Sequence, residues 1–341
     1  MRSPNVRSNK VVVVTGASAG VGRAAAREFA RTGANVALLA RNGDALDNAR
    51  AEVESYGRQA LAIPLDVSDA DAVERAALAI ESELGPIDVW VNNAMVTIFS
   101  PVALLQPDEV RRVTEVTYLG TVNGTLSALR RMLPRNRGAI VQVGSALAYR
   151  SIPLQAPYCG AKSAIRGFTD SLRTELLHSG SRVSITMVQM PALNTPQFDW
   201  CRTHLPRNPQ PVPPIFEPEV AARAIVWASR HRRREVFVGA STVAAIWGNR
   251  LLAPLLDRYL ARTAYHSQLT DEPVEPDRPD NLWRTVPRDH GAHGRFGDRA
   301  GKSSRELWLT THSRLLLSAC AVGAGLVWLA ASRVSVGSRH N

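Results

Sequence analysis

The chain has 341 residues, 45% of them hydrophobic, and a net charge of +11 that is carried mostly by arginine. This length and composition allow one large domain with a buried core and a further segment beyond it. Because the arginines are spread along the chain and do not form one stripe, we expect no nucleic-acid partner.

The three cysteines, Cys159, Cys201 and Cys320, are widely separated and form no CxxC pair. This pattern argues against a disulfide framework or a zinc site and favours a reducing compartment. Residues 1–9 are a polar, basic tail, and the apolar run that follows, Val11 to Val14, is too short for a signal peptide. We therefore expect the N-terminal part of the chain to stay in the cytoplasm.

A strand, a glycine-rich turn and a helix are predicted near the start of the chain. Val11 to Val14 is a β-branched run, residues 15–22 read Thr-Gly-Ala-Ser-Ala-Gly-Val-Gly, and 23–30 favour a helix. Glycines in such a turn let the backbone approach a pyrophosphate at the N-terminus of the helix. One glycine-rich turn is weak support by itself, so the units that follow decide the interpretation.

The second predicted strand covers residues 35–40, and Arg41 stands directly at its end. In dinucleotide-binding folds an acidic residue here binds the ribose hydroxyls of NAD, whereas an arginine accommodates the 2′-phosphate of NADP. Positions 40 and 41 hold no acid, and Arg23 could assist Arg41. We therefore predict NADP as the cofactor and NAD as the less favoured one. The alternative is that Arg41 is an ordinary surface residue.

Two further strands continue the alternation. Residues 60–67 carry Asp66 at their end, where a carboxylate could accept from an adenine amino group, and residues 87–91 run into Asn92-Asn93-Ala94. A helix is predicted between them, from Asp69 to Leu84. Strands that alternate with helices predict a doubly wound α/β domain, with about seven mostly parallel strands and a ligand at their carboxyl ends.

Ser145, Tyr158 and Lys162 are the candidate catalytic residues. Ser145 ends a buried strand predicted over 139–144, and its hydroxyl could hydrogen-bond a substrate oxygen. Tyr158 and Lys162 are four apart on a predicted helix, so the ammonium can favour the phenolate of a side chain whose ordinary pKa is about 10. Such a set could serve as an acid/base site for an alcohol or carbonyl. The alternative is an ordinary pair on a helix surface.

Over roughly residues 10–250 the sequence resembles the short-chain dehydrogenase/reductase family. The matching motifs are Thr-Gly-x3-Gly-x-Gly at 15–22, Asp-Val at 66–67, Asn-Asn-Ala at 92–94, the Ser145, Tyr158 and Lys162 set, and Phe237-Val-Gly. The resemblance implies that Tyr158 is the general acid/base, Lys162 lowers its pKa and binds the nicotinamide ribose, and Ser145 orients the substrate. It also implies that the cofactor is bound by Gly16, Ser18, Gly20, Val21, Gly22, Arg41, Asp66, Val67, Asn93, Ala94, Tyr158, Lys162, Leu193 and Thr195.

The sequence departs from the family pattern at three places. Met95 stands where the family usually has glycine, and Thr117 stands where it has a catalytic asparagine. Thr117 could still support a proton relay if its hydroxyl bonds backward along its helix. The loop after the strand 182–189 reads Met-Pro-Ala-Leu-Asn-Thr, in which Leu193 and Thr195 keep the positions expected to meet the nicotinamide carboxamide.

The region after this loop is expected to form a substrate lid. Phe198 and Trp200 could cover a hydrophobic substrate or simply pack onto the core. A helix is predicted over 220–229 and the last strand over 235–239. Residues 244–259 are apolar at helical spacing, interrupted by Pro254, and could pack on the domain, form an oligomer contact or lie near a membrane.

Beyond the domain, expected over 10–262, we predict a polar linker over 263–306, a transmembrane helix over 307–332 and a basic tail over 333–341. The apolar run 315–331 carries no charge, and about 17 residues is the lower limit for spanning a bilayer. A buried or partner-binding helix is the alternative. His290 and His293 have a spacing that could ligate a metal, but we expect solvated loop histidines and no metal site.

We predict an NADP(H)-dependent oxidoreductase that acts on a carbonyl or alcohol group. A membrane anchor would make a lipophilic substrate plausible, and a homo-oligomer is compatible with the sequence. The alternative is a membrane-tethered, dinucleotide-binding sensor or scaffold with little or no turnover, which the changes at Met95 and Thr117 would fit.

Overall fold

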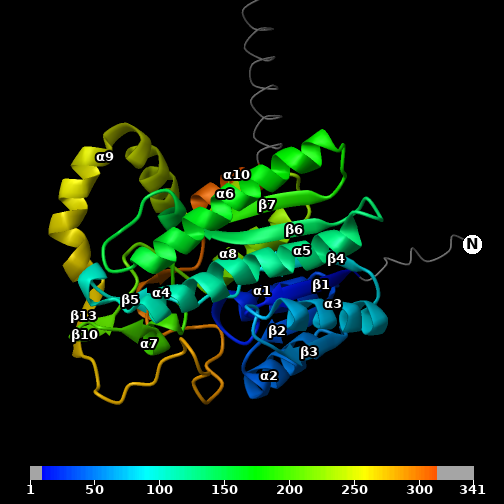
Figure 1. Cartoon of the computed structure of the whole chain (residues 1–341), viewed down its shortest axis with the longest axis horizontal. Coiled ribbons are helices and arrows are strands. Elements are labelled where there is room, and N and C mark those ends of the chain that lie inside the picture. The colour runs from blue at the N-terminus through cyan, green and yellow to red at the C-terminus, as the bar shows by residue number, and fades with distance from the viewer. Residues whose placement is uncertain (1–9, 313–341) are drawn as a thin grey trace, which may run out of the picture.

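A seven-stranded parallel sheet forms the centre of the structure, a computed structural model in which residues 10–312 are described (Figure 1). The spatial order of the strands is β12-β7-β6-β4-β1-β2-β3. The order reverses at β1, beside β4, and in such sheets ligands bind at the carboxyl ends near the reversal. The strands are β1 (Val11–Thr15), β2 (Asn35–Ala40), β3 (Ala60–Pro64), β4 (Ile87–Asn92), β6 (Ala139–Ser145), β7 (Ser184–Met190) and β12 (Glu235–Phe237).

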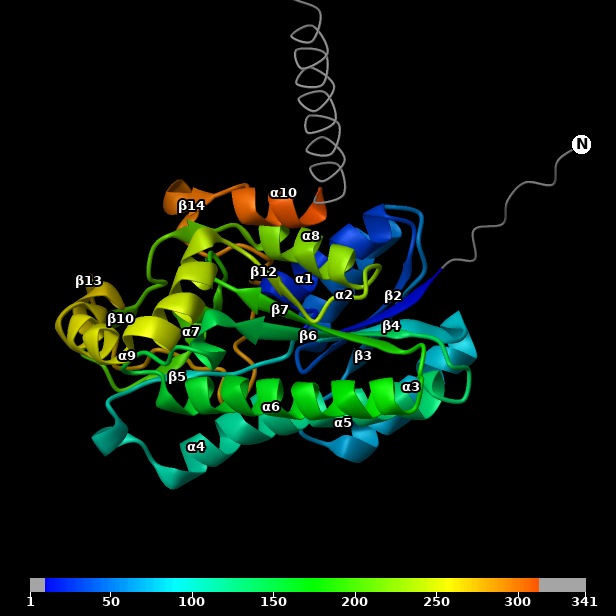
Figure 2. The ribbon, with the colours of Figure 1, turned by 90° about the horizontal axis from the view of Figure 1, so that it is seen from above.

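Helices cover both faces of the sheet, as Figure 2 shows. One face is covered by α1 (Gly20–Arg31), α2 (Gly43–Glu54) and α8 (Pro218–Ala228). The other is covered by α3 (Ala70–Leu84), α5 (Gly120–Met132) and α6 (Ala156–His178). The prediction of a doubly wound α/β domain is therefore confirmed.

The run of valines in β1 shows why the central strands are continuously apolar. Val12 and Val14 pack into the core on the side of α1, whereas Val11 and Val13 pack into the core on the side of α3. Because both faces of the sheet are covered, neither set of side chains can be polar.

A smaller lid region lies over the carboxyl edge of the sheet. Its core contains Phe99, Phe198 and Phe296, which come from distant parts of the chain. The Phe198 ring lies 6.0 Å from that of Phe99 and 5.9 Å from that of Phe296, measured between centroids. The region consists of β5 (Ile98–Phe99), β8 (Ala192–Leu193), α7 (Gln197–Trp200), β9 (Arg202–Thr203), β10 (Arg207–Pro209), β11 (Ile215–Phe216), β13 (Leu269–Pro273) and β14 (Ala300–Gly301).

Helix α9 (Ala240–Ser267) projects beside the lid and has non-helical backbone angles at Leu252, just before Pro254. It exposes large apolar side chains, among them Trp247, Leu251 and Tyr259. Packing within the described residues therefore does not account for its apolar spacing. The oligomer and membrane interpretations of residues 244–259 stay predictions.

The polar segment 263–306 is not a free linker, so this part of the predicted domain organisation is wrong. Its first residues belong to α9, and β13 and β14 then pair with strands of the lid. Leu282, Ala292 and Phe296 are buried with relative exposures of 0%, 2% and 5%. These few apolar anchors hold a segment whose average composition is polar.

The predicted transmembrane helix lies mostly outside the described residues. Of residues 307–332, only 307–312 are described, mainly as the end of α10 (Arg305–Thr311). The tails 1–9 and 333–341 also lie outside. Across 10–312, none of the helices is both long enough and apolar enough to cross a membrane.

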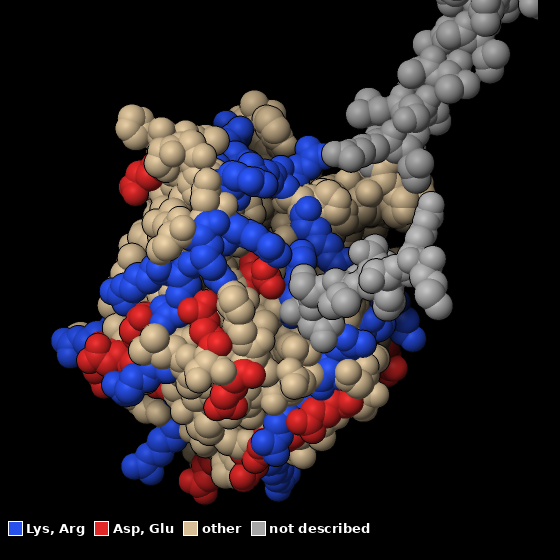
Figure 3. Space-filling view, turned by 90° about the vertical axis from the view of Figure 1, so that its right-hand side faces the viewer, with Lys and Arg blue, Asp and Glu red and all other residues tan. Residues whose placement is uncertain are grey.

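On the face shown in Figure 3, Lys and Arg side chains predominate in the upper half, whereas Asp and Glu are mixed with them in the lower half. Several arginines are also paired in the structure; Glu74, for example, binds both Arg130 and Arg131. That the chain has no nucleic-acid partner stays a prediction.

Candidate active site

One cavity of about 520 Å³ follows the carboxyl edge of the sheet and continues under the lid. All of the predicted site residues line it except Gly22 and Thr117. Segments far apart in the sequence therefore meet at one place, because the carboxyl ends of parallel strands share an edge.

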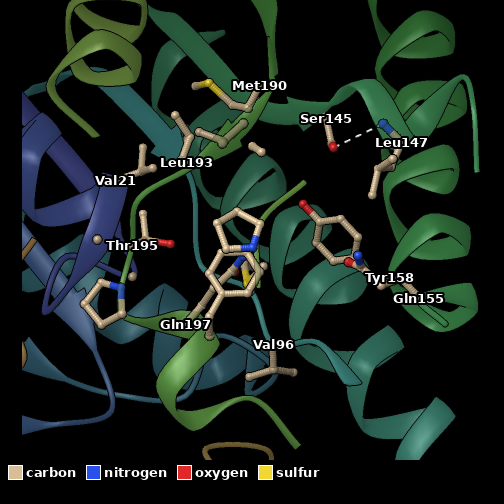
Figure 4. A pocket seen from close by; sticks show the side chains of 18 of the residues that line it. Val21, Val96, Ser145, Leu147, Gln155, Tyr158, Met190, Leu193, Thr195 and Gln197 are labelled. Carbon is tan, nitrogen blue, oxygen red and sulfur yellow. Dashed lines mark hydrogen bonds between the residues drawn. The ribbon is translucent and has the colours of Figure 1, made fainter. Parts of the chain in front are cut away.

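The side chains of Ser145 and Tyr158 lie near each other on one wall of this cavity (Figure 4). Ser145 ends β6, and its Oγ accepts a hydrogen bond of 3.1 Å from the backbone N–H of Leu147. This contact uses an acceptor position of the hydroxyl and leaves its proton free for another partner. Tyr158 lies in the first turn of α6, where Pro157 is tolerated because the first backbone N–H groups of a helix have no partner within it.

Burial raises the pKa of Tyr158 well above its ordinary value, although the neighbouring Ser145 hydroxyl works against this. The phenol therefore keeps its proton at neutral pH. Desolvation is the largest influence on the pKa of Tyr158 in this structure, and a lowering of that pKa by Lys162 stays a prediction.

Lys162 is buried, with a relative exposure of 3%. Its Nζ donates a hydrogen bond of 2.7 Å to the carbonyl of Val143 and lies 5.6 Å from the centroid of the Tyr158 ring. Burial lowers the pKa of Lys162 to about 8. The ammonium thus lies beside the tyrosine, with donor capacity left after the bond to Val143.

The glycine-rich turn fits the backbone of a dinucleotide-binding site. Gly16 has φ of +67°, and a Cβ there would lie 2.9 Å from the Cα of Ala94. A Cβ on Gly22 would lie 2.2 Å from the carbonyl oxygen of Gly16. Gly22 thus acts by close packing inside the turn, which explains why it does not line the cavity.

Asn93 holds this turn in place. Its side-chain amide donates to the carbonyl of Thr15 at 2.9 Å, and its backbone N–H donates to the Thr15 hydroxyl, also at 2.9 Å. Because the turn sits at the N-terminus of α1 beside the long cavity, the residues present fit a nicotinamide dinucleotide.

The C-terminal segment 281–294, which we call the strap, lies across the end of the cavity that is lined by the glycine-rich turn and Arg41. The backbone N–H of Gly20 donates to the carbonyl of Gly291 at 3.0 Å. Arg23 pairs with Asp289 of the strap and, at 2.9 Å, with Glu52 of α2. Asn42 donates from its side chain to the carbonyl of Val286 at 3.4 Å.

The strap also occupies Arg41, the predicted contact for a 2′-phosphate. The Arg41 Nη1 donates to the carbonyls of Leu282 and Trp283 at 3.4 and 3.2 Å, and its Nη2 donates to the carbonyl of Asn281. Arg41 lines the cavity as predicted, but much of its guanidinium is used by protein carbonyls.

Asp66 is similarly engaged. One carboxylate oxygen accepts from the backbone N–H and the hydroxyl of Ser68, at 3.0 and 2.8 Å, and the other accepts from Arg112. Burial would raise the pKa of Asp66, but the hydrogen bonds from Arg112 and Ser68 hold it below its ordinary value. Arg112 also donates to the strap carbonyl of Leu282 at 3.0 Å. This role of Arg112 could not be predicted from the sequence, because its partners are distant along the chain.

Thr117 lies in a π-helical segment, Thr114–Leu119, between α4 (Pro107–Val113) and α5. Its hydroxyl donates to the carbonyl of Val96 at 3.0 Å and accepts from the N–H of Val96 at 3.2 Å. The expected bond backward along its own helix is therefore wrong, and Thr117 is not a cavity residue. It fixes the loop after β4, and Val96 of that loop lines the cavity.

The two strap histidines do not form a joint site. The His290 ring stacks edge-on against Trp200, with centroids 4.2 Å apart. His293 is exposed and lies near Glu217 and Glu219 in a cluster that could hold a metal. However, Glu217 accepts from Asn194 at 3.0 Å and Glu219 pairs with Arg27 at 2.8 Å, so the protein itself supplies partners for both carboxylates.

Comparisons with known proteins agree with this geometry. The profile described as short chain dehydrogenase matches residues 10–204. The uncharacterized oxidoreductase YxnA of Bacillus subtilis is 32% identical over 327 residues, which cover 95% of this chain and 91% of that protein. The fatty acyl-CoA reductase of Acinetobacter baylyi is 29% identical over 239 residues, 70% of this chain and 78% of that protein.

Among solved structures, the alcohol dehydrogenase of Thermococcus sibiricus, complexed with 5-hydroxy-NADP, is similar to this chain. The two are 28% identical, the match covers 67% of this chain and 95% of that one, and the TM-score is 0.59.

Proposed function

Because the chain belongs to the short-chain dehydrogenase family, we propose that it is an NADP(H)-dependent oxidoreductase acting on a carbonyl or alcohol group. The observation that carries the proposal is the position of Ser145, Tyr158 and Lys162 on the wall of the cavity that the glycine-rich turn also lines. A sensor or scaffold without turnover is not favoured, since it has no chemical need for this set.

In the direction of reduction, the bound nicotinamide supplies the hydride. Tyr158 carries its proton at neutral pH and donates it to the carbonyl oxygen of the substrate. Ser145 donates a hydrogen bond to the same oxygen, using the hydroxyl proton that its contact with Leu147 leaves free. Lys162 places a positive charge beside Tyr158 as negative charge develops there.

The cofactor preference rests on Arg41 and on the lack of an acid at the end of β2. The solved relative from Thermococcus sibiricus carries an NADP derivative, which supports the same preference. We propose that the glycine-rich turn binds the pyrophosphate and that Asp66 and Val67 border the adenine. Tyr158 and Lys162 would bind the nicotinamide ribose, and Leu193 and Thr195 would meet the carboxamide.

A lipophilic substrate is supported by the lid side of the cavity. Within the described chain, neither residues 190–214 nor α9 contribute an Asp, Glu, Lys or Arg to the lining. A charged substrate group would therefore be desolvated there without a partner. The lining on this side includes Met190, Phe198, Val212, Pro213, Leu260 and Ala264.

We also propose that residues 307–332 anchor a cytoplasmic catalytic domain to a membrane. The support is the uncharged run 315–331 in the sequence. In cells expressing the full chain, Leu326→Asp should move the protein from the membrane pellet to the supernatant. An unchanged pellet fraction would contradict the anchor and leave the enzyme assignment intact.

Turnover by Tyr158→Phe tests the main proposal. With NADPH and a panel of aliphatic aldehydes and ketones, we expect kcat to fall by a factor on the order of 100 or more while NADPH still binds. Tyr56→Phe is the matched control, because Tyr56 is exposed at the end of α2, outside the cavity. Retention of full activity by Tyr158→Phe would contradict the role given to this residue.

A further inference from the structure

The lysine and arginine side chains that line the cavity differ in whether they already bind other groups of the protein. Among residues 10–312 they are Arg41, Lys162 and Arg288. Arg41 donates to strap carbonyls, and Lys162 donates to Val143. Arg288, by contrast, has no hydrogen bond, ion pair or ring contact with any residue in this range.

Contacts on both sides fix the position of Arg288. On one side, Val286 accepts from Asn42, two residues beyond the end of β2; on the other, Asp289 pairs with Arg23 of α1. Gly291 then accepts from Gly20 in the glycine-rich turn. Arg288 therefore lies between the end of β2 and the N-terminus of α1, the place where the adenosine ribose lies in dinucleotide-binding sheets.

The backbone at Arg288 is also unusual. Its φ is +94°, in a region that residues other than glycine rarely adopt. Such a conformation persists where the surroundings determine it, and here the contacts of Val286 and Asp289 do so. The result is an arginine at the rim of the cavity without a protein partner.

We propose that Arg288 recognises the 2′-phosphate of NADP(H), so that the strap is part of the cofactor site. This inference rests on the proposed function, because it names the residue behind the NADP preference. Arg41 and Arg23, the residues expected from the sequence, are largely engaged with the strap backbone and with carboxylates. A guanidinium suits a phosphate monoester because it can donate two parallel hydrogen bonds.

Half-cofactor probes test this proposal without turnover. The full chain is titrated calorimetrically with adenosine 2′,5′-bisphosphate and with 5′-AMP. In Arg288→Gln, we expect the Kd of the bisphosphate to rise about ten- to a hundredfold, as for loss of a charged hydrogen bond, and the Kd of 5′-AMP to change less than about twofold. Arg288→Lys should recover part of the loss, because it restores the charge without the fork.

Arg284→Gln is the matched control, since Arg284 is an exposed arginine of the same strap that does not line the cavity. It should leave both Kd values unchanged. Arg288 has no partner among the described residues, so its substitution should not alter the melting temperature; this checks that the variant is folded.

Three results would overturn the proposal. An equal loss for both probes in Arg288→Gln would assign the residue to the pyrophosphate or to holding the strap. Unchanged discrimination in Arg288→Gln, with loss in Arg41→Gln, would assign the phosphate to Arg41. Equal binding of both probes by the unmodified chain would contradict recognition of the 2′-phosphate, but it would not contradict the oxidoreductase assignment. Only a failure of every adenine nucleotide to bind would contradict both the role of Arg288 and the oxidoreductase assignment.

Discussion

The two ends of the cavity differ in how their polar side chains are used. At the end proposed to hold the nicotinamide, Ser145, Tyr158 and Lys162 come from one stretch of chain, and their contacts leave donors free for ligands. At the adenosine end, Arg41 and Asp66 are largely engaged by the strap and by Arg112. The proposed catalytic set is therefore encoded locally, whereas the proposed recognition of the adenosine half depends on a distant segment.

Replacing Lys162 tests the local end with the largest expected effect. Lys162→Met should lower kcat on the order of a hundredfold or more, because the phenol loses the neighbouring positive charge and the ribose loses a donor. Steady-state kinetics with NADPH measure this. A kcat within twofold of the unmodified enzyme would mean that Lys162 only fills space.

Packing between α5 and the end of β4 should be intolerant of added volume. A Cβ on Gly124 would lie 2.2 Å from the Asn92 Oδ1, so Gly124→Ala should lower the free energy of unfolding by about 1–3 kcal/mol. In Gly167→Ala the new Cβ has nothing within 4 Å, and helix propensity should stabilise that variant by about 0.5–1 kcal/mol. Urea denaturation compares the two, and equal stabilities would contradict this packing.

The lowered pKa of Lys162 predicts a pH dependence at the end proposed to hold the nicotinamide. In carbonyl reduction, kcat/KM should be flat below about pH 8 and fall above it, as Lys162 loses its proton. Between pH 8 and 10.5 the unfolded lysine binds more protons than the folded one, so Lys162 makes the free energy of unfolding rise with pH in this window. Lys162→Met should lack this contribution, and a rise of the same size in the variant would contradict the assignment.

The smallest effect is expected at the strap. Asp289→Asn removes the ion pair with Arg23, which keeps Glu52 as a partner, so the loss of stability should be about 1 kcal/mol or less. Amide hydrogen exchange should nevertheless quicken at Gly20, whose N–H binds the strap carbonyl of Gly291. Asp277→Asn, which changes an exposed carboxylate before the strap, is the control. Unchanged exchange at Gly20 would show that Asp289 does not hold the strap.

The same contrast explains what the sequence could predict. The strands, the glycine-rich turn and the Ser145, Tyr158 and Lys162 set carry local patterns, and the structure contains them. The strap carries no such local pattern, because Leu282 and Ala292 are isolated apolar residues in a polar segment. Arg41 was correctly placed at the cavity, but its partners are backbone carbonyls, which no side-chain pattern reveals.

Calorimetric titration of the full chain with NADPH and with NADH tests whether it is an NADP(H)-dependent oxidoreductase. We expect NADPH to bind, and to bind more tightly than NADH by a factor on the order of ten or more. If the folded chain bound neither dinucleotide, the assignment as an NADP(H)-dependent oxidoreductase would be contradicted.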